Sequence, residues 1–153
     1  MNNPLLTDDL LPKFGHIRTE HMETAIDQIL SENRMKIQTL AQQEEPSWET
    51  LAQPMQELEN KLSNAWSVIS HLNGVMNNDD LRKSYQNCLE KLTEYSTEVS
   101  QNGALCEAYK KLAARDDFKE LSEPQRKSIE NILRDFRLGG VDLPEDKKQR
   151  YAD

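Results

Sequence analysis

The stretch 47–69, SWETLAQPMQELENKLSNAWSVI, decides the fold of this chain. Its apolar residues recur at spacings of four, three, four, three and four, which is the period of one face of an α-helix. They are Leu51, Met55, Leu58, Leu62, Ala65 and Ile69. Ser47 precedes them as a candidate N-cap, and Pro54 predicts a kink or a restart after a first helical turn. The pattern therefore predicts a long helix with one buried face, which ends where Gly74 breaks it.

The same rhythm continues on both sides of this stretch. Upstream, Thr19 is a candidate N-cap for a helix over about 19–43, whose apolar stripe is interrupted at Asn33. Downstream, Asn78 is a candidate cap for a third helix that stops at Asn102-Gly103, where glycine favours a left-handed C-cap. A short fourth helix follows and ends by Asp116-Asp117.

The last thirty-two residues, 122–153, contain the clearest helix boundaries in the chain. Ser122 and Gln125 have the spacing of a capping box, Pro124 lies in the first turn, and Gly139-Gly140 ends the helix. Pro144 then begins a further helix that reaches Asp153 without a cap. We expect the chain to stop inside that helix, as a piece of a larger protein would.

Composition supports an all-α fold. The chain has nineteen leucines and four valines, and β-branched residues are the ones that favour strands. Short links between long stripes favour antiparallel neighbours, so we predict an up-and-down antiparallel bundle of about five to six helices. Residues 1–18 are irregular and apolar, and we expect an extended arm anchored on the helical part, 19–153. The anchoring side chains would be Leu5, Leu6, Leu10, Leu11, Phe14 and Ile17.

Charge and hydropathy exclude several function classes. The net charge is −8, with −9 in residues 1–109 and +1 in residues 110–153. Neither part has the basic footprint that phosphate binding requires, so no nucleic-acid partner is expected. No signal peptide or membrane span is evident, and Cys88 and Cys106 fall at apolar helix positions, as small buried hydrophobes do. We therefore expect a soluble, cytoplasmic protein with reduced thiols and no membrane partner.

The sequence offers no catalytic, cofactor-binding or metal-binding residue. It contains no phosphate-binding loop, no nucleophile elbow and no H-E-x-x-H motif, in which two histidines one helical turn apart reach one zinc ion. His16 and His21 with Glu20 come nearest, but they span a predicted helix start and their spacing is one residue too long. His71 is predicted to satisfy carbonyls at a helix end. Paired carboxylates, which lie at helix ends or in links, are explained by the helix dipole and solubility. They are Glu44-Glu45, Asp79-Asp80, Asp116-Asp117 and Glu145-Asp146.

Several of these residues carry a resemblance to a known family. They are Asn3-Pro-Leu-Leu6, Ser47-Trp48-Glu49, Ser70-His71-Leu72-Asn73, Ser84-Tyr85, Glu94-Tyr95-Ser96-Thr97, Leu133-Arg-Asp-Phe136, Gly139-Gly140, Leu143-Pro144 and Lys147-Lys-Gln-Arg-Tyr151. By these motifs the chain resembles the N-terminal region of the oligopeptidase A family of zinc metallopeptidases, which includes thimet oligopeptidase, neurolysin and bacterial dipeptidyl carboxypeptidase. The resemblance covers essentially the whole chain.

The resemblance implies a role without catalytic residues. Family members are several times longer, and their zinc motif and glutamate ligand lie downstream of the region matched here. Their N-terminal helices build one wall of a deep channel that admits short peptides and excludes folded proteins. By this resemblance, zinc belongs to a monomeric parent protein and not to this segment. Its partners are short peptides and the remaining catalytic domain of the same chain.

Two other classes of function compete with this one. A complete, noncatalytic helical bundle that acts as an interaction module is also compatible with the four–three stripes. The reading frame after Asp153 would separate the two hypotheses. A metal enzyme built in the bundle core needs E-x-x-H pairs, and no histidine here has a glutamate three residues before it.

Overall fold

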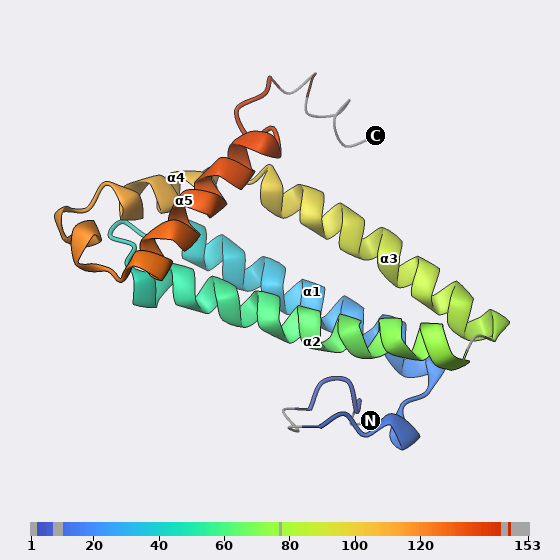
Figure 1. Ribbon diagram of the computed structural model, residues 1–153. Helices are drawn as coiled ribbons and strands as arrows, with labels where there is room; N and C mark the ends of the chain where they lie inside the picture. The colour runs from blue at the N-terminus through green and yellow to red at the C-terminus, as the bar shows by residue number, and fades with distance from the viewer. Residues whose placement is uncertain (1–2, 8–10, 77, 145–146, 148–153) are drawn as a thin grey trace. The chain divides into compact units, whose positions relative to one another are not determined.

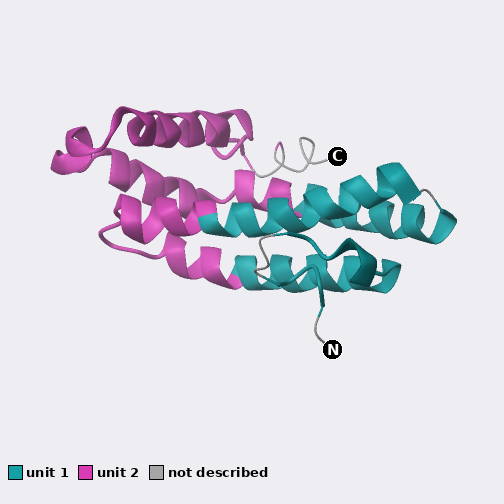
Figure 2. Ribbon diagram, turned by 60° about the horizontal axis from the view of Figure 1, so that its bottom comes forward, with its two compact units in different colours: residues 1–34, 57–94 teal, residues 35–56, 95–153 magenta. Residues whose placement is uncertain are grey.

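The computed structural model describes residues 3–7, 11–76, 78–144 and 147 (Figure 1). The predicted all-α class is confirmed, since these residues form five α-helices and no strand. They are α1 (Thr19–Ala41), α2 (Gln53–Met76), α3 (Asp79–Ser100), α4 (Gly103–Ala113) and α5 (Glu123–Leu138). Three short turns join them: η1 (Phe14–His16), η2 (Trp48–Ala52) and η3 (Asp116–Glu120). The chain divides into two compact units, residues 1–34 with 57–94 and residues 35–56 with 95–153 (Figure 2).

In unit 1 the helices α1 and α2 run antiparallel. Near the start of α2, Lys61 Nζ lies 2.7 Å from Glu32 Oε2, which is in the second half of α1 within this unit. Near the end of α2, the ring of His71 lies 5.4 Å from that of Phe14, just before α1. Residue numbers rise from Lys61 to His71 along α2, while those of their partners fall from Glu32 to Phe14. The two helices therefore run in opposite directions.

The third helix of unit 1 is parallel to α1. Asn87 Nδ2 donates to Glu23 Oε1 over 3.0 Å, and one turn later Lys91 Nζ donates to Asp27 Oδ2 over 2.8 Å. From the first pair to the second, the residue number rises by four in both helices, so the two helices run in the same direction. Unit 1 is therefore an up-down-up arrangement, as the short links predict.

The core of unit 1 is built from the predicted helical stripes. Trp66 and Tyr85 add a stacked pair with centroids 4.8 Å apart. Unit 1 also buries Ile17, Met22, Ala25, Ile26, Ile29, Leu30, Ala65, Val68, Ile69, Leu81 and Cys88. Burial of such side chains supplies the main favourable free energy of folding.

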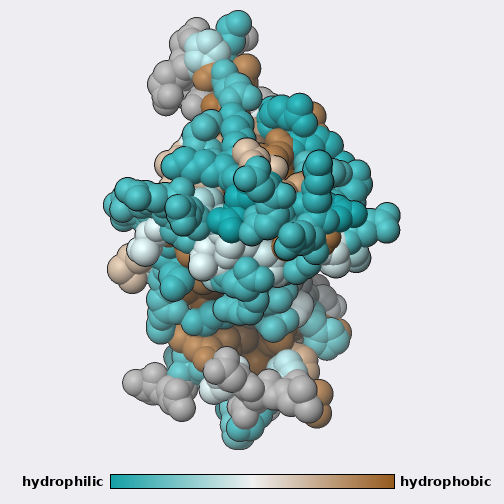
Figure 3. Space-filling model, turned by 90° about the vertical axis from the view of Figure 1, so that its left-hand side faces the viewer, coloured by the Kyte–Doolittle hydropathy of each residue, from teal (hydrophilic) through white to brown (hydrophobic). Residues whose placement is uncertain are grey.

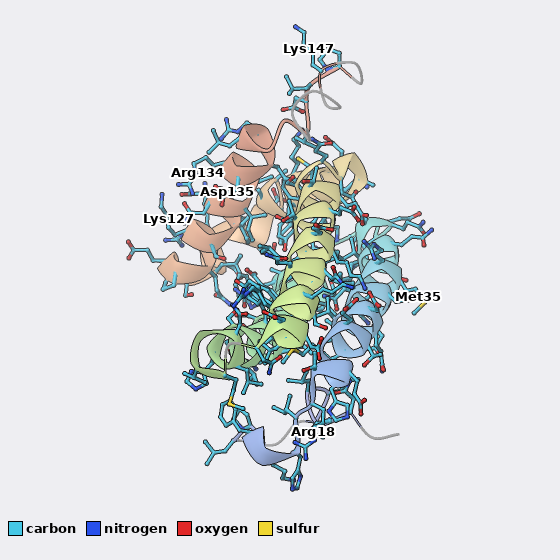
Figure 4. All side chains as sticks on the ribbon, turned by 90° about the vertical axis from the view of Figure 1, so that its right-hand side faces the viewer. Arg18, Met35, Lys127, Arg134, Asp135 and Lys147 are labelled. Carbon is cyan, nitrogen blue, oxygen red and sulfur yellow. The ribbon has the colours of Figure 1, made fainter. Side chains whose placement is uncertain are left out.

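In unit 2, α4 and α5 form the main pair. Tyr109 and Phe136 contact each other at 6.1 Å between centroids, and Ile129 is fully buried. The polar face of α5 points outward: Figure 4 shows Lys127, Arg134 and Asp135 projecting from the helix. This explains why α5 carries alternating charges on its exposed side.

Most predicted helix starts are confirmed by their caps. Ser122 and Gln125 form the capping box, with Ser122 N donating to Gln125 Oε1 over 2.9 Å. Asn78 Oδ1 accepts from Leu81 N over 2.9 Å at the start of α3. The helix after Ser47 begins with the π-helical turn η2 before α2 continues from Gln53, which is the restart predicted from Pro54.

The predicted break at Gly74 is wrong, because α2 continues to Met76. A glycine inside a helix costs only about 1 kcal/mol relative to alanine, which is too little to end a helix of this length one turn early. His71 consequently lies inside α2 and not after its end. The first helix also ends slightly early, at Ala41 and not at residue 43.

Three further predictions are corrected. Gly103 is not a left-handed stop: α3 ends at Ser100, and Asn102 caps α4 by accepting from Leu105 N over 2.9 Å. Asn33 does not interrupt the apolar stripe of α1, because its side chain is buried within it. Leu11 is 75% exposed and does not anchor the arm.

The arm and the C-terminal end are described only in part. Leu10 of the arm lies outside the described residues. The same is true of Glu145-Asp146 and of residues 148–153, so most of the helix predicted to begin at Pro144 falls outside them. The end of α5 is as predicted, with Gly139 as the C-cap and Gly140 at a φ of 81°.

Candidate functional site

A groove lies between the N-terminal arm and α2 in unit 1. Its volume is about 650 Å³, within the range of about 300–1,000 Å³ that small-ligand sites occupy. The arm and the residues just after it contribute Pro4, Leu5, Leu6, Thr7, Pro12 and Ile17, and α2 contributes Glu57, Asn60, Lys61, Asn64, Ala65, Ser67 and Val68. One wall is therefore apolar and the other is polar.

The arm is fastened to the first turns of α1 by Asn3. Asn3 Nδ2 donates to the main-chain carbonyl of His21 over 2.8 Å and to Thr24 Oγ1 over 3.1 Å. Asn3 Oδ1 accepts from Leu5 N over 3.0 Å, which forms a local turn. Pro4 and Pro12 further restrict the backbone of this wall.

His21 completes the start of α1. Its Nδ1 accepts from Arg18 N over 3.0 Å, so it satisfies a backbone donor that the helix leaves unpaired. Arg18 Nη1 donates to the carbonyl of Gly15 over 3.2 Å, which ties η1 to the helix. Figure 4 labels Arg18 at this end of α1. His21 is thus a capping residue of α1. The side chain of Arg18 holds η1 against the start of that helix.

Lys61 of the polar wall forms an ion pair with Glu32. Lys61 Nζ donates to Glu32 Oε2 over 2.7 Å, and Gln28 Nε2 donates to Glu32 Oε1 over 2.8 Å. These hydrogen bonds, that of Lys61 first, hold the pKa of Glu32 below its usual value. Lys61 is therefore paired with a carboxylate, and Asn60 and Asn64 beside it are exposed.

A second charged cluster crosses from α1 to α3. Lys91 Nζ lies 2.7 Å from Asp27 Oδ1 and 3.5 Å from Glu23 Oε2. The hydrogen bond with Asp27 raises the pKa of Lys91. Cys88 is fully buried beside this cluster, and burial raises the pKa of its thiol to about 11. A thiol in that state is a poor nucleophile, so the cluster stabilises the helix pair and offers no reactive group.

The histidines and paired carboxylates that could in principle bind a metal do not come together in the described part of the structure. Among the described residues, no group of three or more His, Cys, Asp or Glu side chains is placed to hold a metal ion. His71 packs on Phe14, and His16 is exposed in η1. Asp79 and Asp80 lie in the first turn of α3. Glu145-Asp146 lies outside the described residues.

Unit 2 has smaller hollows around Arg115. Its guanidinium donates to Asp117 through two bonds of 2.8 and 2.7 Å. That pairing raises the pKa of Arg115 and lowers the pKa of Asp117. Glu44 and Glu45 line one hollow of about 460 Å³. Figure 3 shows that hydrophilic residues cover much of the face seen in that view, and that hydrophobic residues gather in its lower part.

Two features of the groove were not found from the sequence. The anchoring role of Asn3 depends on a carbonyl eighteen residues away, which no local pattern reveals. Asn60 and Asn64 sit one helical turn apart on the polar side of the α2 stripe, where carboxamides look like ordinary surface residues.

Comparison with known proteins identifies the family. The family model for the N-terminal domain of neurolysin and thimet oligopeptidase matches residues 26–148. The chain is 42% identical to oligopeptidase A of Haemophilus influenzae over 153 residues, which is all of this chain and 22% of that protein. It is 41% identical to oligopeptidase A of Escherichia coli over 154 residues, or 23% of that protein. A probable cytosolic oligopeptidase A of Arabidopsis thaliana is 25% identical over 150 residues.

The chain therefore belongs to the neurolysin/thimet oligopeptidase family and corresponds to its N-terminal domain. It spans between a fifth and a quarter of the length of the oligopeptidase A relatives. The resemblance drawn from the sequence motifs is confirmed. Within the described residues, no helix is both long and apolar enough to cross a membrane.

Proposed function

We propose that this chain is the N-terminal helical part of an oligopeptidase A-type zinc metallopeptidase that hydrolyses short peptides. Residues 1–18 would be its arm and residues 19–153 its helical N-terminal domain. The observation that carries the proposal is the match of the whole chain to the oligopeptidase A relatives at 41–42% identity. An N-terminal family domain covering residues 26–148 supports the same placement.

The role proposed for this segment is to form a wall of the substrate channel. Long helices with one buried and one solvated face suit such a wall, because they are rigid and present a polar surface to peptides. A wall of fixed shape limits substrate size by excluding folded proteins. The catalytic step would then be carried out entirely by residues outside this chain.

Zinc would likewise be held outside this segment. The sequence has no H-E-x-x-H motif, and the described residues offer no group that fits a metal ion. We therefore assign no catalytic, cofactor-binding or metal-binding residue here. The proposed partners are short peptides and the catalytic domain of the same chain, in a monomeric, cytoplasmic parent protein.

A chimera tests the proposal. This chain replaces the aligned N-terminal segment of the Escherichia coli relative, and cleavage of a short fluorogenic peptide is measured beside cleavage of a folded protein. We expect the chimera to cleave the peptide and spare the folded protein, whereas this chain alone with added zinc cleaves neither. A chimera with its zinc-motif glutamate replaced by glutamine is the inactive control. A folded chimera without peptidase activity, or zinc-dependent cleavage by this chain alone, would overturn the proposal.

A further inference from the structure

We propose that one face of unit 1 docks an amphipathic helix from the catalytic part of the same parent protein. The face lies along α2 and α3 on the side away from α1, and we call it the α2–α3 face. The inference rests on the proposed function, because that function places a catalytic part in the same polypeptide. The face is formed by Leu58, Leu62 and Trp66 of α2 and by Tyr85, Leu89 and Leu92 of α3.

The two rows of side chains adjoin. Within each row the residues are three or four apart, so they share one side of their helix. The rings of Trp66 and Tyr85 stack with centroids 4.8 Å apart, and this contact joins the rows. Because α2 and α3 run in opposite directions, Leu62 and Leu89 fall in the next turn away from the stacked rings. The six residues therefore make one continuous apolar surface across two helices.

Neither α1 nor the arm covers this surface within the described residues of unit 1. On α3, Lys91 bonds to α1, and Leu89 is two residues away, which is about 200° around the helix. On α2, Asn64 lines the groove beneath the arm, and Leu62 is again two residues away, about 200° around the helix. The face thus points away from both neighbours.

The exposure of these side chains shows that the surface lacks a partner. Leu89 is 44% exposed, and the other five residues of the face are only half-buried. Apolar side chains that meet water side by side mark an interaction surface. The exposed residues along the sides of the two rows carry one charge among four, so the face selects an apolar partner. They are Glu59, Ser63, Gln86 and Thr93.

A helix is the shape that fits the face. The row from Leu58 to Trp66 is about 12 Å long, which is slightly more than two helical turns. A partner helix with apolar residues at i, i+4 and i+7 or i+8 repeats that length. Three helices that leave one side open lack the fourth helix that closes a bundle.

The catalytic part is the most favoured source of that helix. The chain covers 22% and 23% of the length of two oligopeptidase A relatives, so more than three quarters of such a protein lies outside it. A segment of the same polypeptide meets the face at an effective concentration of about millimolar, as linked modules do. A second copy of this chain has no such advantage, and a short peptide buries less apolar surface than a helix of a folded domain.

The experiment compares this 153-residue chain with the chimera in which it replaces the aligned segment of the Escherichia coli relative. Hydroxyl radicals oxidise exposed side chains, and mass spectrometry gives the oxidation rate of each residue. We expect Trp66, Tyr85 and Leu89 to be oxidised about fivefold or more slowly in the chimera, because a docked helix excludes water from them. Val75, which is 62% exposed on the other side of α2, should keep its rate.

A variant of Leu89 tests the same surface by stability. Leu89→Glu should barely change the urea midpoint of the 153-residue chain, since this side chain already meets water. In the chimera the carboxylate would be buried without a partner, so we expect the protection of Trp66 to disappear and soluble yield to fall by about tenfold or more. Lys83→Glu is the matched control, because Lys83 is exposed on α3 about 120° from Leu89 and should leave both readouts unchanged.

Two other occupants would give different patterns. Protection of Trp66 and Leu89 that grows with the concentration of the chain alone, and is no greater in the chimera, would assign the face to a second copy. Protection that appears only when a short peptide is added would assign it to a peptide. Either pattern, equal oxidation rates in chain and chimera, or equal slowing of Val75 overturns the inference.

The outcome separates this inference from the proposed function. An active chimera whose α2–α3 face stays exposed leaves the proposed function standing and ends this inference, whereas an inactive chimera with a protected face does the reverse. Should the chimera be insoluble, this chain is co-expressed with the Escherichia coli relative that lacks the aligned segment. Failure of the two chains to co-purify, or equal co-purification of the Leu89→Glu variant, then counts against the inference.

Discussion

The side-chain amide of Asn3 donates to the main-chain carbonyl of His21 over 2.8 Å, and this bond fastens the N-terminal arm to the first turn of α1. The same amide reaches Thr24 Oγ1, and its oxygen accepts from Leu5 N. One residue thereby orders the apolar wall of the groove. His21, whose ring caps the helix, presents its carbonyl on the side where the arm lies.

Replacing Asn3 by alanine should release the arm. Three hydrogen bonds are lost, each worth about 1 kcal/mol at a partly exposed site. The total of about 3 kcal/mol should make trypsin cleave after Lys13 and Arg18 on the order of a hundredfold faster, because opening of the local structure limits cleavage. Global unfolding should change little, since the buried residues of α1 are untouched.

Thr24→Val is the matched control for Asn3→Ala. It removes one acceptor of the Asn3 amide and keeps the His21 carbonyl, so it should increase the cleavage rate by a smaller factor. Equal cleavage rates in Asn3→Ala and the unchanged chain would show that Asn3 does not hold the arm.

The sequence predicts α2, α3 and α5 well because each has a period-3.6 stripe and a capping side chain. Ser122 with Gln125, Asn78 and Ser47 all act at the positions expected of them. Two of the errors arose at glycine, at Gly74 and at Gly103. The local preference of glycine suggests a stop at each, but one glycine costs only about 1 kcal/mol, and α2 continues through Gly74 to Met76.

The groove shows the other limit of sequence reasoning. Its walls come from residues 4–7, 12 and 17 and from residues of the segment 57–68, which local patterns cannot bring together. The apolar composition of the arm predicts that it packs on a surface, but not which of its leucines do so. Leu11 is exposed, whereas Leu5 and Leu6 line the groove. Asn3 binds the main-chain carbonyl oxygen of His21. Every residue has such a carbonyl, so the sequence does not identify the partner.

Gly139→Ala should destabilise unit 2. A Cβ at Gly139 would lie 2.8 Å from Ser100 Cβ and 3.2 Å from the Ser100 carbonyl oxygen. The φ of −72° is ordinary, so the penalty is steric and not conformational. Overpacking of this kind costs about 1–3 kcal/mol, measurable by urea denaturation.

Two variants test that explanation. Gly103→Ala meets nothing within 4 Å and should be neutral or mildly stabilising. Combining Gly139→Ala with Ser100→Gly removes one of the clashing atoms and should recover part of the loss. If Gly139→Ala is as stable as Gly103→Ala, the close approach of Ser100 and Gly139 is not rigid.

Gly74→Ala should stabilise the chain by about 0.5–1 kcal/mol, because alanine loses less backbone entropy than glycine inside a helix. Gly74 is in α2, and a Cβ there meets nothing within 4 Å. The midpoint of urea denaturation should rise with an unchanged slope. A lower midpoint would indicate that α2 ends before residue 74, as its sequence alone suggests.

The two cysteines should react slowly in the folded state. Cys88 and Cys106 are both free and buried, and burial raises the pKa of each thiol. At pH 8 we expect an aromatic disulfide reagent to modify neither thiol until denaturant is added, when both react. Fast modification of one thiol in the native chain would contradict the buried placement of that cysteine.

Stability should fall in alkaline solution because of Cys88. Its pKa is about 11 in the folded chain, against 9.0 for an ordinary thiol. Between these values the unfolded thiol ionises and the folded one does not, so unfolding releases a proton and becomes more favourable as the pH rises. A shift of this size corresponds to about 2–3 kcal/mol, fully lost only above pH 11. Urea denaturation at intervals from pH 7 to 10.5 measures the slope.

A variant without thiols isolates this effect. Cys88→Ala/Cys106→Ala should be less stable at pH 7, because each truncation leaves space in a packed core. Above pH 9 its stability should decline less steeply than that of the unchanged chain, since no thiol remains to ionise on unfolding. Lys91, whose pKa is also raised, retains its pairing in this variant and adds a decline only above about pH 10.5, its ordinary value. Parallel stability curves between pH 9 and 10.5 would show that the buried thiols do not set the alkaline limit.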